Sequence, residues 1–208
     1  LVKGHTIEEA INIEKEWQQI QQIRKDAGLI TGWAIFQNYG GIVSEGVDFD
    51  YISVDYGTDL DKIHSYPEDM WNDFVKKNPS ASGLLTRTGE IQKIIRRSIL
   101  ANVQVLGGPL VDQYYLFNNM KVADENADAY EQFEKQVAKV HDERIKSGAI
   151  SRWSFWRTVQ PYSWENNAAY ITVQAYPKLQ GLVSDGYVEP IKRLMNMDPP
   201  AFIKKANT

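Results

Sequence analysis

Apolar residues recur every three to four positions near the start of the chain, at Ile13, Trp17, Ile20 and Ala27. This spacing is typical of an amphipathic α-helix that buries one face. Thr6 is followed three residues later by Glu9, which is the sequence of a capping box, and Gly28 stands where a helix end takes a left-handed residue. The pattern predicts a helix over residues 7–27.

A short apolar and aromatic stretch, residues 29–36, follows this helix and predicts a strand that is covered on both faces. Residues 50–56 then alternate in polarity, with Tyr51, Ser53 and Asp55 on one side of the chain and apolar side chains on the other. Because side chains of a strand point alternately to its two faces, this stretch predicts a second strand with one polar face.

The same pattern returns about 120 residues later, as a predicted helix over residues 127–147 and strands over 150–158 and 168–176. Residues 14–36 and 134–156 carry identical residues at Glu14/Glu134, Lys15/Lys135, Arg24/Arg144, Gly28/Gly148, Ile30/Ile150 and Trp33/Trp153. In the last strand, Tyr170, Thr172 and Gln174 take the places of Tyr51, Ser53 and Asp55. This recurrence indicates a duplicated fold.

The segment between the two copies contains a predicted helix within residues 59–77 and a predicted loop over residues 78–88. A further helix is expected from Gly89, because isoleucines recur at helical spacing at Ile91, Ile94, Ile95 and Ile99. Residues 102–106 fit either its last turns or an edge strand, and residues 112–122 read as a strand.

Gly107, Gly108 and Pro109 break the chain, and we therefore expect two units, residues 1–108 and 109–208. By the repeat offset, the counterpart of the strand at 112–122 would precede Leu1. The counterpart of 89–106 would follow the last residue. The first unit is thus expected to lack its leading strand and the second its final strand.

The order strand, helix, strand, hairpin, strand, helix resembles the ferredoxin-like split βαβ arrangement. With a long first helix, a glycine exit and an aromatic strand, each unit is similar to members of the dimeric α+β barrel superfamily. The resemblance implies an α+β fold of two tandem ferredoxin-like units, whose antiparallel sheets pair into one barrel with the helices outside. That superfamily includes oxygenases, haem-handling enzymes, dehydratase-like proteins and sensory proteins, so the resemblance bears on fold more than on function.

The composition of the chain restricts the kinds of partner that it is expected to bind. The net charge of −4 and pI near 5.5 argue against a nucleic-acid surface, which needs clustered Lys and Arg. No apolar run approaches the roughly 20 residues of a membrane span. The absence of cysteine excludes disulfides and thiolate metal sites.

The chain opens on Leu1 without a targeting peptide, which favours an exported protein whose signal was removed. A small molecule is the expected partner, and a homodimer is left open.

His141 is the residue that most clearly points to chemistry, since it stands where the first copy has Gln21 and imidazole exchanges protons near neutral pH. The alternative is a hydrogen-bonded boundary histidine, and core packing explains the strand aromatics equally well. The expected ligand cavity lies between the helix at 127–147 and its sheet. It is lined by His141, Tyr170, Thr172, Trp153, Phe155 and Asn118. The histidines lack metal-ligand spacing, so no metal site is expected.

Three functions follow from these observations. The first is a small-molecule-binding protein of the tandem α+β barrel type, with its site under His141. The second, implied by the resemblance, is a cofactor-free monooxygenase-like or haem-handling enzyme with its site in the second unit. The third is a structural or interaction module. No phosphate-binding glycine loop or nucleophile elbow is present, and whether the protein is catalytic stays open.

Overall fold

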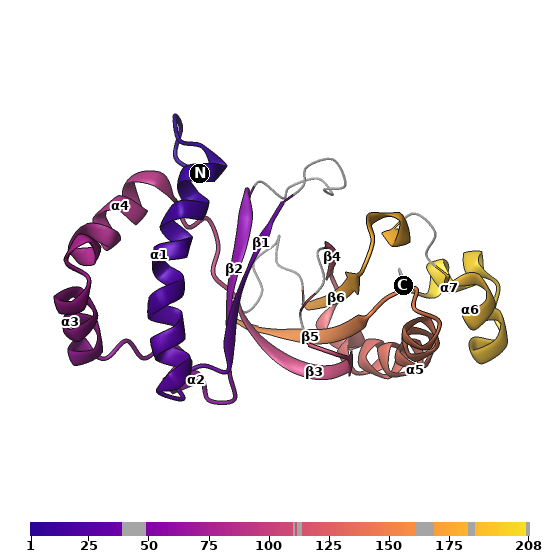
Figure 1. Ribbon diagram of the computed structural model, residues 1–208. Helices are drawn as coiled ribbons and strands as arrows, with labels where there is room; N and C mark the ends of the chain where they lie inside the picture. The colour runs from indigo at the N-terminus through magenta and orange to yellow at the C-terminus, as the bar shows by residue number, and fades with distance from the viewer. Residues whose placement is uncertain (39–48, 110, 112–113, 161–168, 183–185, 207–208) are drawn as a thin grey trace. The chain divides into compact units, whose positions relative to one another are not determined.

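The computed structural model describes residues 1–38, 49–109, 111, 114–160, 169–182 and 186–206. The chain divides into two compact units, Leu1–Arg96 and Arg97–Thr208, each with helices and an antiparallel sheet (Figure 1). The predicted α+β class is therefore confirmed. The described strands form two separate sheets of two and four strands, and the expected closure into one barrel is not seen in this part of the chain.

The first unit contains the predicted long helix and strand pair, followed by three shorter helices. Its elements are α1 (Ile7–Asp26), β1 (Gly32–Gln37), β2 (Tyr51–Tyr56), α2 (Leu60–His64), α3 (Glu68–Lys77), a 3₁₀ turn (Pro79–Gly83) and α4 (Leu84–Ile91). The capping box forms as predicted, because Thr6 Oγ1 accepts from the Glu9 amide at 3.2 Å and Glu9 Oε2 accepts from the Thr6 amide at 2.7 Å. These bonds satisfy donors that the first helical turn leaves free.

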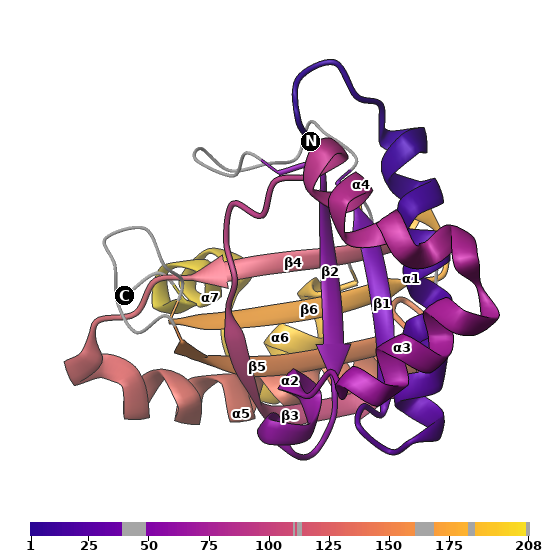
Figure 2. The same ribbon diagram turned by 90° about the vertical axis from the view of Figure 1, so that its left-hand side faces the viewer.

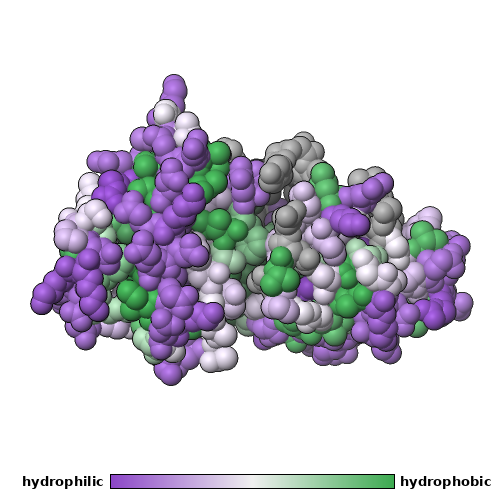
Figure 3. Space-filling model, viewed as in Figure 1, coloured by the Kyte–Doolittle hydropathy of each residue, from purple (hydrophilic) through white to green (hydrophobic). Residues whose placement is uncertain are grey.

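The core of the first unit joins the apolar stripe of α1 to α3 and α4. Its buried members are Ile13, Ile20, Phe74, Ala81 and Leu84. Trp17 of α1 packs against Trp71 of α3 with ring centroids 6.0 Å apart, and its indole N–H donates to Thr88 Oγ1 at 2.9 Å. On the side of this unit seen in Figure 3, hydrophilic residues predominate, as expected of helices that bury only one stripe.

The predictions for residues 78–106 were wrong in two places. The expected loop at 78–88 is mostly helical, and the expected helix from Gly89 ends at Ile91. Residues 92–98 carry no helix, and Ile94 and Ile95 are 65% and 59% exposed. Ile99 begins strand β3 (Ile99–Gly107), because β-branched residues suit a strand and β3 finds a partner in β5. The alternative of an edge strand at 102–106 is confirmed.

The second unit has a longer sheet and helices gathered on one of its faces. Its elements are β3, β4 (Tyr114–Met120), a 3₁₀ turn (Asp124–Asn126), α5 (Ala127–Lys146), β5 (Arg152–Gln160), β6 (Tyr170–Tyr176), a 3₁₀ turn (Leu179–Leu182), α6 (Val188–Met195) and α7 (Pro199–Ala206). The strands lie side by side in the order β3-β5-β6-β4, and all pairs are antiparallel (Figure 2).

The second unit begins at Arg97, whereas the sequence predicted the division after residue 108. The difference is β3, which precedes the glycine-rich break at Gly107 and Gly108 but pairs with β5. Hydrogen bonding to a distant strand, which local composition does not record, assigns β3 to this unit. The start of the predicted strand at 112–122 lies partly outside the described residues.

The core of the second unit lies on the sheet face that α5 covers. Tyr130, Phe133 and Val137 of α5 pack there against Trp153 and Phe155 of β5. Met195 of α6 and Phe202 of α7 pack against the same core. We call this side the core face. The opposite face of the sheet carries Tyr115, Phe117, Asn119, Ile171, Val173, Ser154, Trp156, Asn102 and Val105, as strand alternation and the pairing register require.

The two units repeat the same helix end and strand register. Gly28 and Gly148 have φ of 70° and 76°, so the prediction of positive φ at both is confirmed. After each helix the glycine and the next residue donate to carbonyls of the last turn, which is the Schellman motif. Trp33 pairs with Asp55 between β1 and β2, and Trp153 pairs with Gln174 between β5 and β6. Each predicted tryptophan therefore lies on the strand after its helix.

Candidate functional site

The seam between α5 and its sheet brings together four of the six residues predicted to bind a ligand. His141 stacks on Trp153 with ring centroids 4.8 Å apart, Trp153 on Phe155 at 6.2 Å, and Phe155 on Tyr170 at 5.2 Å. All four side chains are at most 3% exposed. Trp153 and Phe155 thus lie between His141 and Tyr170 in one continuous stack of rings, and this stack fills the middle of the seam.

His141 is held as a neutral imidazole. Its Nδ1 lies 3.2 Å from Arg144 Nη1, and a guanidinium only donates, so Nδ1 accepts and the ring proton sits on Nε2. Burial, followed by the charge of Arg144, lowers the pKa of His141 well below 6.5. Because its only lone pair is engaged by Arg144, this imidazole is poorly placed to act as a base or a metal ligand.

The other predicted polar residues also have partners within the protein. Asn118 Nδ2 donates to Thr172 Oγ1 at 3.2 Å across β4 and β6. The Tyr170 hydroxyl donates to Glu131 Oε1 at 3.1 Å, and burial together with Glu131 raises the pKa of Tyr170 to about 12. These side chains therefore form the hydrogen bonds that buried polar groups need. The Tyr170–Glu131 bond joins β6 to α5, and the Asn118–Thr172 bond joins β4 to β6.

Arg144, which the sequence analysis did not select, is the centre of the polar contacts at this end of the seam. Its side chain is fully buried, and Nη1 donates to Gln174 Oε1 at 2.7 Å. The hydroxyls of Tyr176 and Tyr187 donate to the same oxygen at 2.9 and 3.0 Å. The guanidinium carbon lies 3.7 Å from the centroid of the Tyr187 ring, a cation–π contact. We call His141, Arg144, Gln174 and Tyr187 the second arginine cluster.

Arg24 forms an equivalent cluster in the first unit. The buried guanidinium donates from Nη1 to Asp55 Oδ2 and Gln21 Oε1, both at 2.6 Å, and from Nη2 to the carbonyl of Ile63. Its carbon lies 3.9 Å from the centroid of the Tyr66 ring. We call Gln21, Arg24, Asp55 and Tyr66 the first arginine cluster.

The two clusters correspond residue by residue. Each arginine stands three residues after its helix neighbour, meets the strand residue that pairs with the unit's tryptophan, and lies over a tyrosine from the segment after that strand. The signal was present in the sequence, because Arg24 and Arg144 are identical in both copies. A charge that is repeated on an otherwise apolar helix face indicates a buried, paired group.

Glu134 and its counterpart Glu14 are a second pair of partly or fully buried charges. Glu134 is 5% exposed and accepts from the Tyr130 hydroxyl at 2.6 Å, while its Oε2 has no hydrogen-bond partner among the described residues. Burial raises the pKa of Glu134, and burial likewise raises the pKa of Glu14, which accepts from Gln92 at 3.0 Å. No described contact ties either carboxyl to a second acid or base of the seam.

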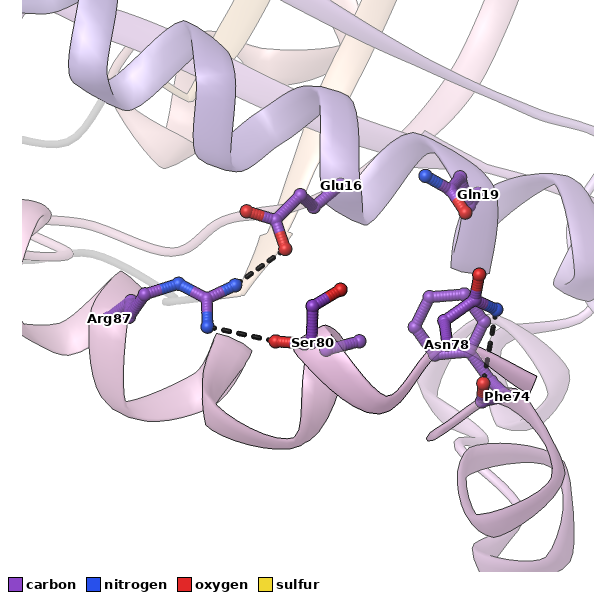
Figure 4. A pocket seen from close by; sticks show the side chains of 7 residues that line it. Glu16, Gln19, Phe74, Asn78, Ser80 and Arg87 are labelled. Carbon is purple, nitrogen blue, oxygen red and sulfur yellow. Dashed lines mark hydrogen bonds and ion pairs between the residues drawn. The ribbon is translucent and has the colours of Figure 1, made fainter. Parts of the chain in front are cut away.

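A hollow of about 330 Å³ lies between α1 and the α3–α4 segment of the first unit (Figure 4). Its polar lining includes Glu16, Gln19, Asn78, Ser80 and Arg87. Arg87 already donates to Glu16 at 2.5 Å and to the Ser80 carbonyl at 3.1 Å, so its charge is neutralised by the protein. The hollow therefore offers little to an anion.

A hollow of about 340 Å³ in the second unit lies beside α5, lined by Gln104, Leu106, Lys135, Ala138, Lys139, Asp142, Glu143 and Leu194. Neither hollow is lined by any of the six predicted residues.

The opposite face of the four-stranded sheet presents a different surface. Asn119, Ile171, Trp156 and Asn102 form one row across all four strands, and Phe117, Val173, Ser154 and Val105 form the next. Trp156 is half-buried, its indole N–H donates to Ser154 Oγ at 2.8 Å, and Asn119 and Asn102 are exposed at the two ends of their row. In the first row a ring and an aliphatic side chain thus lie on the two middle strands with amides on the edge strands, and the second row adds Phe117 and Val105 on the edge strands.

Comparison of the chain with models of known protein families, with curated proteins and with solved structures found no match. Within the described ranges, no group of three side chains is arranged to hold a metal ion. No helix there is long and apolar enough to cross a membrane.

Proposed function

We propose that the protein binds a flat, largely apolar small molecule on the opposite face of its four-stranded sheet. The observation that carries the proposal is the row Asn119–Ile171–Trp156–Asn102. It places a large ring and an aliphatic side chain between two exposed amides. Binding sites for small molecules are typically lined by apolar and aromatic side chains with a few polar groups that fix orientation.

The chemistry of this face fits a planar ligand. Trp156 from β5 and Phe117 from β4 offer ring area, and such rings pack against flat molecules with a modest stacking preference. The amides of Asn119 and Asn102 both donate and accept, so they suit a ligand with carbonyl or hydroxyl groups at its ends. The seam under His141, in contrast, is filled by stacked rings.

We also infer that the two units are tandem copies of one ferredoxin-like ancestor. The matched helix caps, strand registers and arginine clusters support this inference, and β4, α5, β5 and β6 follow the strand, helix, strand, strand order of a split βαβ unit. On β1 and β2, the side away from the arginine cluster carries Phe36, Ile52 and Val54.

Titration with anilinonaphthalene sulfonate, a flat probe whose fluorescence rises outside water, tests the binding proposal. We expect saturable binding near one probe per chain, weakened about tenfold by Trp156→Ala because a stacked ring is worth roughly 1 kcal/mol or more. Asn119→Ala should also weaken binding. Asn118→Ala is the matched control, since Asn118 is the neighbour of Asn119 on β4 but points to the core face and bonds Thr172.

Absence of saturable binding overturns the proposal. A loss with Asn118→Ala but not with Asn119→Ala also contradicts it, because that result places the ligand in the seam under His141.

A further inference from the structure

The outer edge of β2 is open in the described part of the first unit. Among the described strands β2 pairs only with β1, and Asn38 donates its backbone N–H to the Asp50 carbonyl at 2.8 Å. Because alternate residues of an antiparallel strand bond to opposite sides, this bond fixes the direction of the others. The backbone groups of Tyr51, Ser53 and Asp55 point away from β1.

The same edge is filled in the second unit. There the backbone N–H of Thr158 donates to the Ala169 carbonyl at 2.9 Å, as Asn38 donates to Asp50 in the first unit. β6 therefore pairs with β5 in the same register as β2 pairs with β1. β4 occupies the other edge of β6, and its residues Met120, Asn118 and Leu116 pair with Tyr170, Thr172 and Gln174. Those three residues of β6 are the counterparts of Tyr51, Ser53 and Asp55.

Leu1 lies at the position from which such a strand would reach β2. Its backbone nitrogen contacts the Asp50 carboxylate, next to Tyr51 at the start of β2. In the second unit Lys121, about 120 residues later, directly follows the last residue of β4. A strand joined to the amino side of Leu1 therefore enters the open edge in the register that β4 uses, without a linker.

We propose that the open edge of β2 is an acceptor for one antiparallel strand supplied by polypeptide joined to Leu1. The strand resembles β4 in its alternation, because the side chains it sets against Ser53 and Asp55 face the polar contacts of the first arginine cluster. Addition of a strand satisfies the edge backbone groups and extends the sheet from two to three strands. The inference rests on the duplication and not on ligand binding.

The test attaches the seven-residue β4 sequence Tyr114–Met120 directly before Leu1. Hydrogen exchange at the amides of Tyr51, Ser53 and Asp55 should slow by about tenfold or more, since paired amides exchange only on opening. The matched control inserts one glycine between the added strand and Leu1. That slip exchanges the two faces of the strand, so it should give little protection.

Equal protection in the two extended proteins overturns the proposal, as does full protection of these amides without any extension. Protection that appears only together with dimerisation also contradicts it, because the strand then comes from another molecule. Probe binding at Trp156 is measured in parallel. A change in probe binding without a change in hydrogen exchange at β2 bears on the binding proposal alone, so the two proposals can fail independently.

Discussion

At the residue scale, two buried arginines share a position and differ in their partners. Arg24 meets the carboxylate of Asp55, and Arg144 meets the amide of Gln174 and the imidazole of His141. Each guanidinium has several hydrogen bonds and a tyrosine face. A buried charge is tolerated only with such contacts. Both clusters therefore hold a helix against its sheet.

Replacing Arg144 with alanine should lower the free energy of unfolding by about 3 kcal/mol or more, because it leaves a cavity, removes the hydrogen bond to Gln174 and leaves the buried His141 Nδ1 without its donor. Urea titration measures the loss. Arg157→Ala is the control, since Arg157 is 56% exposed and its ion pair with Glu131 should contribute about 1 kcal/mol or less. Equal losses of stability in the two variants would contradict the role of Arg144 in holding α5 against its sheet.

His141 should make stability depend on pH. The folded imidazole has a pKa well below 6.5, whereas an unfolded histidine titrates near 6.5, so below about pH 6.5 the unfolded chain binds the extra proton. The free energy of unfolding should therefore decrease as pH falls from there, by up to about 1.4 kcal/mol per pH unit.

His141→Gln, which copies Gln21, keeps an acceptor for the arginine and should remove this slope between pH 8 and 5 with little loss at pH 8. His64→Gln, at an exposed position, should retain the slope. Unfolding measured in urea at both pH values decides between them. Buried Glu134, whose raised pKa acts in the opposite direction, is common to all the proteins and cancels in the comparison.

The sequence predicted the positions of the seam residues and not their packing. Apolar spacing placed Trp153 and Phe155 on a buried strand face, and the repeat placed His141 on the helix edge. Spacing carries no information about volume, so it did not indicate that these rings would stack and fill the expected cavity. Arg144 was missed because a charged residue at the edge of an apolar stripe usually faces solvent.

At the element scale, the sequence predicted helix ends correctly, because the residues that determine a helix end lie close to it in the chain. Both long helices end within one residue of their predicted last residue, since capping residues and glycine exits act over a few positions. The stretch from Gly89 failed because isoleucine spacing also suits a strand, and pairing of β3 with β5 decided the outcome. Such pairing depends on residues far away in the sequence.

Gly148→Val should lower the free energy of unfolding by about 1 kcal/mol or more. Its φ of 76° is costly for a side chain with a Cβ, and no atom within 4 Å would clash, so the cost is that of the backbone alone. Thermal unfolding measures it. Gly108→Val, at a glycine that also has open space but no positive φ, is the control and should change the melting temperature little.

At the scale of the whole molecule, the described residues form one core in each unit, and each unit has its own arginine cluster. Arg24→Ala should therefore speed hydrogen exchange in α1 and β2 and leave α5, β5 and β6 nearly unchanged. Arg144→Ala should give the reverse pattern. A uniform rise throughout the chain in both variants would show one cooperative unit instead of two.

The different partners of the two arginines also bear on how the chain avoids misfolding. A newly made chain holds two helices of the same length and shape and two sheets that pair in the same register, so an exchange of helices is the obvious error. If the helices exchanged sheets, Arg24 would meet the amide of Gln174, and Arg144 would meet the carboxylate of Asp55 with His141 in the place of Gln21. In the native arrangement Asp55 accepts from both Arg24 and the Gln21 amide, so it is the pair of helix residues, and not the arginine alone, that matches each helix to its own sheet.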